Sequence, residues 1–268
     1  MLSARPSRAL RVAVLSSVRA PGFAYLLDPA VGRGSRYEIV AFLATDPTHP
    51  ERARATAAGV PALLRDFRGF YGARGAKLSD LGVRAEFDRG TLHTLSPFEP
   101  DLVVLCGYLH LLTRPMLDAF PDRIVNVHDA DLTLTEPDGR PQYRGLRSTR
   151  DAVLGGATET RTTVHLVTRQ VDGGPLLLRS WPYPVAALVA EARAAGANDV
   201  MKAYAYAHRG WMMETCWGPL LAQTLRLFAT GAVRVLSGRA VVAGRFGPID
   251  LPLPEPTAPA MRRASIGD

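Results

Sequence analysis

Short apolar runs alternate with segments of helical periodicity along most of the chain. Apolar and β-branched residues fill 10–16 and 37–43, and a weaker run covers 60–64. Between the first two runs, Phe23 and Leu26 lie on one side of a predicted short helix. Strands that alternate with helices in this way predict an α/β protein with a mostly parallel sheet.

The central strands of this sheet are predicted at 101–107 and 123–128. The first of them, DLVVLCG, is apolar almost throughout, which is typical of a strand buried on both faces of a parallel sheet. The other predicted elements are helices at 84–96, 114–120, 147–154, 186–195 and 198–216, strands at 161–168 and 175–183, and a hairpin at 232–243. The last helix can also extend to residue 230, with a break at Gly218-Pro219.

Composition narrows the classes of function. The net charge is +7, from 32 basic and 25 acidic residues, but the only dense basic run is Arg262-Arg263, so nucleic-acid binding is not expected. No stretch approaches 18 apolar residues, and no transmembrane helix or signal peptide is predicted. Cys106 and Cys216 lie in apolar surroundings without CxxC spacing, which predicts buried free thiols, no metal site and a cytoplasmic protein.

Polar residues interrupt the apolar stretch IVNVHDADL at 124–132. Asn126 and His128 are two residues apart, so on a strand they point to the same face. Asp172 lies in VDGGP, a tight turn after a later strand. An amide, an imidazole and a carboxylate at strand ends can stabilise an oxyanion and move a proton. All three are also common structural residues, so the spacing alone leaves both interpretations open.

Three segments carry a family resemblance: residues 100–128, YRGLRSTRDAVLGG at 143–156 and TTVHLVTRQVDGGPLLL at 162–178. In this order they resemble the folate-dependent formyltransferase family, and within it the members that act on phosphoribosylglycinamide. The similarity runs from about residue 10 to about residue 230. It implies a Rossmann-like fold and transfer of a formyl group from 10-formyltetrahydrofolate, as donor co-substrate, to a primary amine.

The resemblance also implies roles for single residues. Asn126 and His128 would stabilise the oxyanion, and Asp172, with a bound water, would assist proton movement and hold His128. Residues implied at the folate are Tyr108, Leu109, His110, Leu111, Leu112, Gln170 and Val171. Residues implied at a phosphorylated acceptor are Ser16, Ser17, Arg19, Arg84 and Glu214. For Arg84 and Glu214 the alternative is an ordinary solvated residue on a helix.

The implied organisation is one formyltransferase domain over 1–245. Its first half, about 10–110, would bind the acceptor, and about 107–230 would hold the catalytic and folate-binding residues. A tail rich in proline and alanine, 246–268, is expected to be disordered. The expected partners are small molecules, without nucleic acid or membrane, and the chain is expected to be a monomer or a homodimer.

The sequence departs from the family in three places. The serine- and glycine-rich phosphate loop is replaced by 16–22, where Pro21 lacks an N–H donor. Asp129 and Asp131 replace an apolar, proline-bounded stretch, and the following loop is longer, with 133–142 as the apparent insertion. The two acids either favour the imidazolium form of His128 or anchor the longer loop through its arginines, Arg140 and Arg144.

These departures leave the acceptor open. Phosphoribosylglycinamide is the first expectation, and another amine, such as an amino sugar nucleotide or a natural-product intermediate, is the alternative. Transfer to methionyl-tRNA and hydrolysis of the donor are less expected, because those proteins carry an additional C-terminal or N-terminal domain. A folate-binding protein without catalysis is a further alternative, which the presence of all three polar residues opposes.

Overall fold

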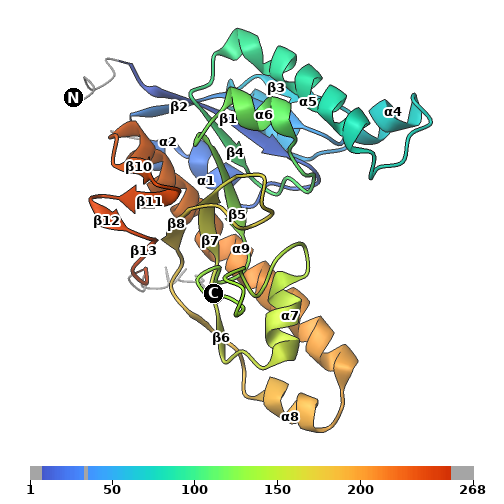
Figure 1. Ribbon diagram of the computed structural model, residues 1–268, viewed down its shortest axis with the longest axis vertical. Coiled ribbons are helices and arrows are strands. Elements are labelled where there is room, and N and C mark those ends of the chain that lie inside the picture. The colour runs from blue at the N-terminus through green and yellow to red at the C-terminus, as the bar shows by residue number, and fades with distance from the viewer. Residues whose placement is uncertain (1–7, 33–35, 255–268) are drawn as a thin grey trace, which may run out of the picture.

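A twisted eight-stranded sheet forms the centre of the computed structural model, which describes residues 8–32 and 36–254 (Figure 1). The strands are β1 (Leu10–Ser16), β2 (Tyr37–Ala44), β3 (Ala62–Leu64), β4 (Leu102–Leu105), β5 (Ile124–His128), β6 (Glu159–Thr160), β7 (Thr163–Leu166), β8 (Leu176–Arg179), β9 (Tyr183–Pro184), β10 (Val233–Leu236), β11 (Arg239–Val242), β12 (Arg245–Phe246) and β13 (Ile249–Asp250). The order in the large sheet is β13-β8-β7-β5-β4-β1-β2-β3. The pairs β5–β7 and β7–β8 are antiparallel and the other neighbours are parallel, so the predicted α/β class and mostly parallel sheet are confirmed.

Helices cover both faces of this sheet. They are α1 (Phe23–Leu27), α2 (Pro29–Gly32), α3 (Glu51–Ala57), α4 (Phe67–Gly72), α5 (Leu81–Leu95), α6 (Arg114–Ala119), α7 (Ser148–Gly155), α8 (Leu188–Ala194) and α9 (Asn198–Ala229), with a 3-10 turn at Ser96–Phe98. Alternate strand residues explain the two layers. Val12, Val14 and Val104 pack against α1 and α9, whereas Ala13 and Val103 pack against α5 and α6.

The long helix α9 differs from its prediction. It runs through Pro219 without a break, although a proline inside a helix removes one backbone hydrogen bond and costs about 3 kcal/mol. The surrounding residues offset this cost, because Cys216, Leu220, Leu221 and Leu225 are fully buried under the sheet. In Figure 1 the N-terminal part of α9 extends beyond the sheet and forms a lower lobe with α7 and α8.

The C-terminal region also extends past the predicted boundary at residue 245. The predicted hairpin forms as β10 and β11, and β13 then pairs with β8 in the large sheet. The remainder of the predicted disordered tail, 255–268, lies outside the described residues. Cys106 and Cys216 are buried free thiols, as predicted. In the described part of the chain, no helix is long and apolar enough to cross a membrane.

Candidate active site

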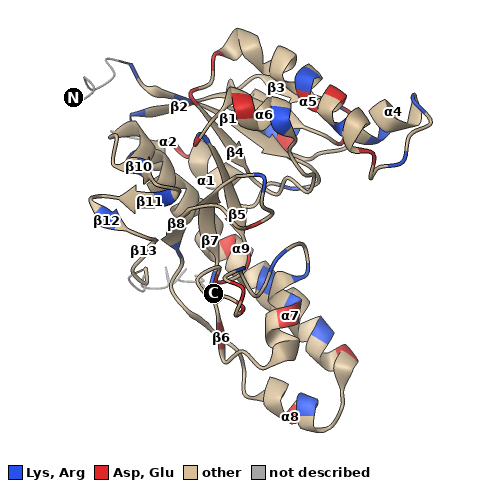
Figure 2. Ribbon diagram, in the orientation of Figure 1, with Lys and Arg blue, Asp and Glu red and all other residues tan. Residues whose placement is uncertain are grey.

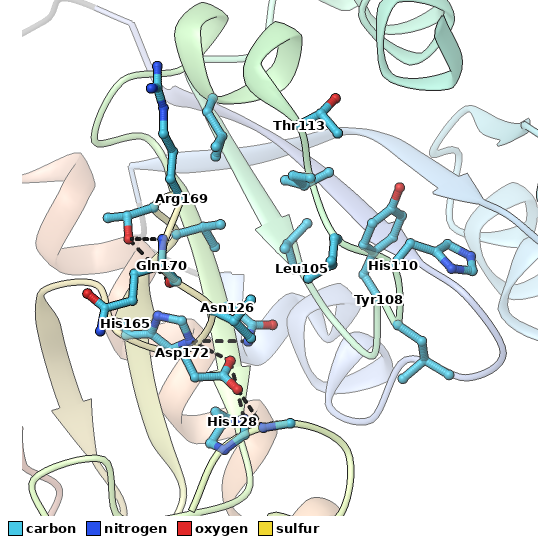
Figure 3. A pocket seen from close by; sticks show the side chains of 18 of the residues that line it. Leu105, Tyr108, His110, Thr113, Asn126, His128, His165, Arg169, Gln170 and Asp172 are labelled. Carbon is cyan, nitrogen blue, oxygen red and sulfur yellow. Dashed lines mark hydrogen bonds and ion pairs between the residues drawn. The ribbon is translucent and has the colours of Figure 1, made fainter. Parts of the chain in front are cut away.

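The order of strands reverses between β1 and β4, and ligands of open α/β sheets bind at the carboxyl ends of the strands near such a point. A cavity of about 900 Å³ lies there. The three predicted catalytic residues, Asn126, His128 and Asp172, all line it. Figure 3 shows them with His165 as one polar cluster on the wall of the cavity.

Asn126 is oriented by His165 on the neighbouring strand. The two residues are directly opposite in the antiparallel pair β5–β7, so their side chains share a face. His165 Nδ1 lies 2.9 Å from the carbonyl oxygen of Leu166 and therefore carries the proton. Its Nε2 is then an acceptor for Asn126 Nδ2, 3.2 Å away. This bond uses one amide hydrogen of Asn126 and leaves the other for a ligand.

His128 and Asp172 form the second half of the cluster. His128 Nε2 donates to the carbonyl oxygen of Tyr143 at 2.9 Å, so its Nδ1 faces Asp172 Oδ1 at 3.6 Å. Asp172 Oδ2 accepts from the N–H of Gly145 at 2.7 Å. A proton on Nδ1 would turn this contact into an imidazolium–carboxylate pair. The loop at 143–145 thus fixes both partners and leaves Oδ1 available for proton transfer.

Burial keeps His165 neutral. It lowers the pKa of His165 to about 4, and the nearby His128 adds to the effect. Between pH 4 and 6.5 the unfolded chain therefore binds a proton that the folded chain does not. The free energy of unfolding should fall as the pH drops through this window, by up to about 1.4 kcal/mol per pH unit.

Urea unfolding at several pH values tests this expectation with His165→Gln, which keeps an acceptor for Asn126. The variant should lose stability less steeply than the wild type between pH 6.5 and 4. His93→Gln, at an exposed position of α5, is the control and should keep the wild-type slope. Equal slopes for the wild type and His165→Gln would contradict the assignment.

The predicted folate-binding segment forms one side of the cavity. Tyr108, Leu109, His110, Leu111, Leu112, Gln170 and Val171 all line it. Helix α5 holds this wall from behind, since Arg84 Nη1 donates to the carbonyl oxygen of Leu111 at 3.1 Å. Asp88 Oδ2 accepts from the N–H of Thr113 at 2.6 Å. The wall combines apolar side chains with a fixed backbone, which suits a planar ring.

Comparisons with known proteins agree with this geometry. Residues 10–191 match the formyl transferase family. The chain belongs to that family. This formyl transferase is 29% identical over 156 residues to the phosphoribosylglycinamide formyltransferase of Escherichia coli (strain K12), covering 56% of this chain and 68% of that one. It is 31% identical over 180 residues to the Mycobacterium tuberculosis (strain ATCC 25618 / H37Rv) protein of the same name, covering 67% and 74%.

A solved structure gives the same result for the fold. Glycinamide ribonucleotide transformylase 1 from Symbiobacterium toebii has a TM-score of 0.67 and 26% identity, and the match covers 87% of this chain and 94% of that one. The resemblance to the formyltransferase family and its Rossmann-like fold is therefore confirmed.

The acceptor residues predicted for this formyl transferase do not line the cavity beside Asn126. Arg84 is buried in α5, where its guanidinium donates to Tyr71, Leu78 and Leu111 and lies 4.2 Å from the ring centroid of Phe67. Glu214 is exposed on α9. The structure thus gives Arg84 a role in holding the segment 108–112 and does not bring it together with Glu214.

The loop that follows β1 is bonded to neighbouring segments of the protein. Ser16 Oγ lies 2.8 Å from His49 Nε2, and Ser17 Oγ accepts from the N–H of Leu109 at 2.9 Å. A Cβ on Gly22 would lie 2.6 Å from the backbone nitrogen of Gly218 in α9, so the loop packs directly on that helix. Arg19 is exposed on this loop, outside the cavity. Both serine oxygens are therefore bonded within the protein, Ser16 to His49 and Ser17 as an acceptor from Leu109.

The two acids after His128 are held by other arginines than predicted. Asp129 is 4% exposed, and its Oδ2 accepts from Arg209 Nε at 2.8 Å while Oδ1 accepts from Trp217 Nε1 at 2.6 Å. Asp131 Oδ2 accepts from Arg179 Nη1 at 3.0 Å. Arg140 and Arg144 are not their partners.

Asp129 secures the turn after His128 in a second way as well. Its carbonyl oxygen accepts from the hydroxyls of Ser148 and Thr149 at the start of α7. Burial raises the pKa of the Asp129 carboxyl, whereas Arg209, Trp217 and His128 act to lower it. The inserted loop closes as a small hairpin with a bridge between Thr135 and Pro141, and Asp131 Oδ1 accepts from the N–H and the hydroxyl of Thr133 at its start.

Three residues of the site were not predicted from the sequence: His165, Arg209 and Trp217. His165 alternates with apolar residues on β7, and only the register of that strand places it opposite Asn126. Arg209 and Trp217 are eight residues apart on α9, a spacing that places them on the same helical face. Within residues 8–32 and 36–254, no group of three or more His, Cys, Asp or Glu could hold a metal ion.

Proposed function

We propose that this chain transfers a formyl group from 10-formyltetrahydrofolate to a primary amine. The observation that carries the proposal is the convergence of Asn126, His128 and Asp172 at one cavity whose side wall is the apolar segment 108–112. An amide, an imidazole and a carboxylate supply the groups that acyl transfer needs. The formyl transferase match over residues 10–191 supports the same reaction.

The proposed mechanism uses the fixed geometry of the cluster. Attack of an amine on a formyl carbon places negative charge on the formyl oxygen and leaves a proton to be removed from the amine. The free amide hydrogen of Asn126 donates to this oxygen, because the other one is held by His165. Asp172 Oδ1, beside His128 Nδ1, receives the amine's proton through a water, and the imidazolium form of His128 would add positive charge near the oxyanion. When the oxyanion collapses, the bond between the formyl carbon and the donor nitrogen breaks, and the proton passes to that nitrogen, which leaves as tetrahydrofolate.

We call the side of the cavity formed by residues 108–112 the folate wall. Its far end suits the anionic tail of such a donor. Arg89, Arg114 and Arg169 line the cavity there. Arg114 and Arg169 lie 3.9 and 3.7 Å from the carboxylate of Asp118, with side chains that are largely exposed. In Figure 3 Arg169 lies at the opposite end of the site from His128. We infer that the donor lies along this axis, with its tail at the arginines and its formyl group at Asn126.

Phosphoribosylglycinamide is the first candidate acceptor, because the E. coli and M. tuberculosis relatives are named for that reaction. Another amine, such as an amino sugar nucleotide, is the second candidate. The loop after β1 favours this alternative, since both of its serines are buried and bonded to other segments and Pro21 has no N–H to offer.

Turnover with purified protein tests the reaction. Mixing the chain with 10-formyltetrahydrofolate and phosphoribosylglycinamide should release tetrahydrofolate and give a product heavier by one formyl group in mass spectrometry. A reaction without amine is the control, because water is a competing acceptor. Transfer to another amine in a parallel screen would favour the second candidate. Release of formate at the same rate with and without any amine would show that the chain is a hydrolase.

A further inference from the structure

The end of the cavity beyond His128 is built from different elements than the folate wall. Its lining comes from the turn after β5, the loop before α7, and helices α7 and α9: Asp129, Gly145, Leu146, Ser148, Arg209 and Trp217. The arginines on the cavity wall, in the described part of the chain, fall into two groups. Arg89, Arg114 and Arg169 lie at the folate end, and Arg209 stands alone at the other. The polar trio lies between them, as expected for a reaction centre between two substrates.

Arg209 is held in place through Nε, and its two terminal nitrogens can donate to a ligand. Its Nε donates to Asp129 Oδ2 at 2.8 Å, and Trp217 holds the second carboxylate oxygen. Its side chain is 32% exposed, and within residues 8–32 and 36–254 its Nη1 and Nη2 have no hydrogen-bond partner. A guanidinium fixed at Nε presents its terminal nitrogens as a rigid fork, which matches the two oxygens of a carboxylate or phosphate.

The mouth of this end carries further positive charge. Arg144 and Arg147 are exposed on either side of Gly145-Leu146, and neither lies within 4.0 Å of a carboxylate in the described chain. The neighbouring arginines differ, since Arg140 pairs with Asp138 and Arg150 pairs with Asp151. Figure 2 shows the blue segments of this loop beside α7. Unpaired arginines at an entrance raise the local concentration of anions.

We propose that Arg209 binds an anionic group of the amine acceptor, a phosphate or a carboxylate, and that Arg144 and Arg147 attract it. This site takes the place of the loop after β1, whose serine hydroxyls are already bonded within the protein. The inference rests on the proposed transfer reaction, because it assigns the second substrate of that reaction. Asp129 and Trp217 are positioning residues in this arrangement, since they hold the guanidinium.

The decisive variant is Asp129→Asn combined with Arg209→Gln. It removes the cation without leaving a buried, unpaired carboxylate, which a single change at Arg209 would do. The Michaelis constant for phosphoribosylglycinamide should rise by about 10- to 100-fold, as expected for the loss of charged hydrogen bonds, while that for the donor stays unchanged. Arg150→Gln is the matched control, because Arg150 is 38% exposed in the same region and lies outside the cavity. An unchanged constant for the acceptor in the double variant overturns the proposal.

Two small anions separate the phosphate from the carboxylate. Inorganic phosphate and acetate are tested as competitors of the acceptor, and the one that inhibits the wild type should lose its effect in the double variant. If neither inhibits, or if inhibition persists in the double variant, Arg209 is not the anion site. If the double variant fails to fold, Arg209→Lys keeps the charge and the ion pair but removes the fork, and it should still weaken inhibition several-fold.

The anion site can still be tested if the proposed transfer reaction fails. If the wild type does not formylate phosphoribosylglycinamide, calorimetric titration of phosphate and acetate into the wild type and the double variant still measures the site. Binding to the wild type that is lost in the double variant supports an anion site at Arg209. Equal binding by both proteins, or no binding by either, overturns it.

Discussion

Replacing His128 by alanine should lower kcat by about 10²- to 10⁴-fold, the usual loss when a residue that moves a proton is removed. His128 faces Asp172 Oδ1 through Nδ1, so without the imidazole the carboxylate loses the partner that shares its proton. The carbonyl oxygen of Tyr143 also loses its donor. Steady-state kinetics with the acceptor identified by the turnover screen provides the measurement, and the Michaelis constant for the donor should change little.

The control for this experiment is His93→Ala, which removes an exposed imidazole from α5. Circular dichroism and thermal unfolding should show that both variants keep the fold. A folded His128→Ala protein with wild-type kcat would exclude His128 from the reaction and leave Asn126 and Asp172 to account for it.

The parts of the site that depend on local hydrophobic pattern and residue spacing could be predicted from the sequence. Apolar runs located β1, β2, β4 and β5 because a central parallel strand is buried on both faces. The two-residue spacing of Asn126 and His128 placed both on the face of β5 that lines the cavity. The segment 108–112 was placed by its resemblance to the family, since its composition alone does not mark it as a binding wall.

The parts of the site that could not be predicted depend on contacts between segments far apart in the sequence. One of the two interpretations of Asp129 paired it with Arg140 or Arg144, which are near it in the chain, but its partner is Arg209, 80 residues away on α9. The helix that carries Arg209 was predicted, but only the packing of its buried residues, such as Met212 and Cys216, places Arg209 beside the turn after β5. Likewise, the role of His165 depends on the register of β7 against β5.

The backbone at Asp172 decides how its carboxylate can be tested. Asp172 has a φ of 53°, in the left-handed region that aspartate and asparagine adopt more readily than alanine. Asp172→Asn therefore keeps the backbone and can still accept the hydrogen bond from Gly145, but it removes the negative charge. Its amide would donate to Nδ1 of neutral His128 and could not stabilise the imidazolium.

We expect Asp172→Asn to lower kcat by about 10²- to 10⁴-fold with a wild-type melting temperature. Asp172→Ala should lose as much activity and should also lower the free energy of unfolding by about 1–2 kcal/mol, because alanine is strained at this φ. The comparison separates chemistry from backbone strain, since only a loss of activity shared by both variants reports on the carboxylate. If Asp172→Asn keeps wild-type kcat while Asp172→Ala is inactive, Asp172 serves the fold of the VDGGP turn, and the proton must leave the amine by a route that does not involve its charge.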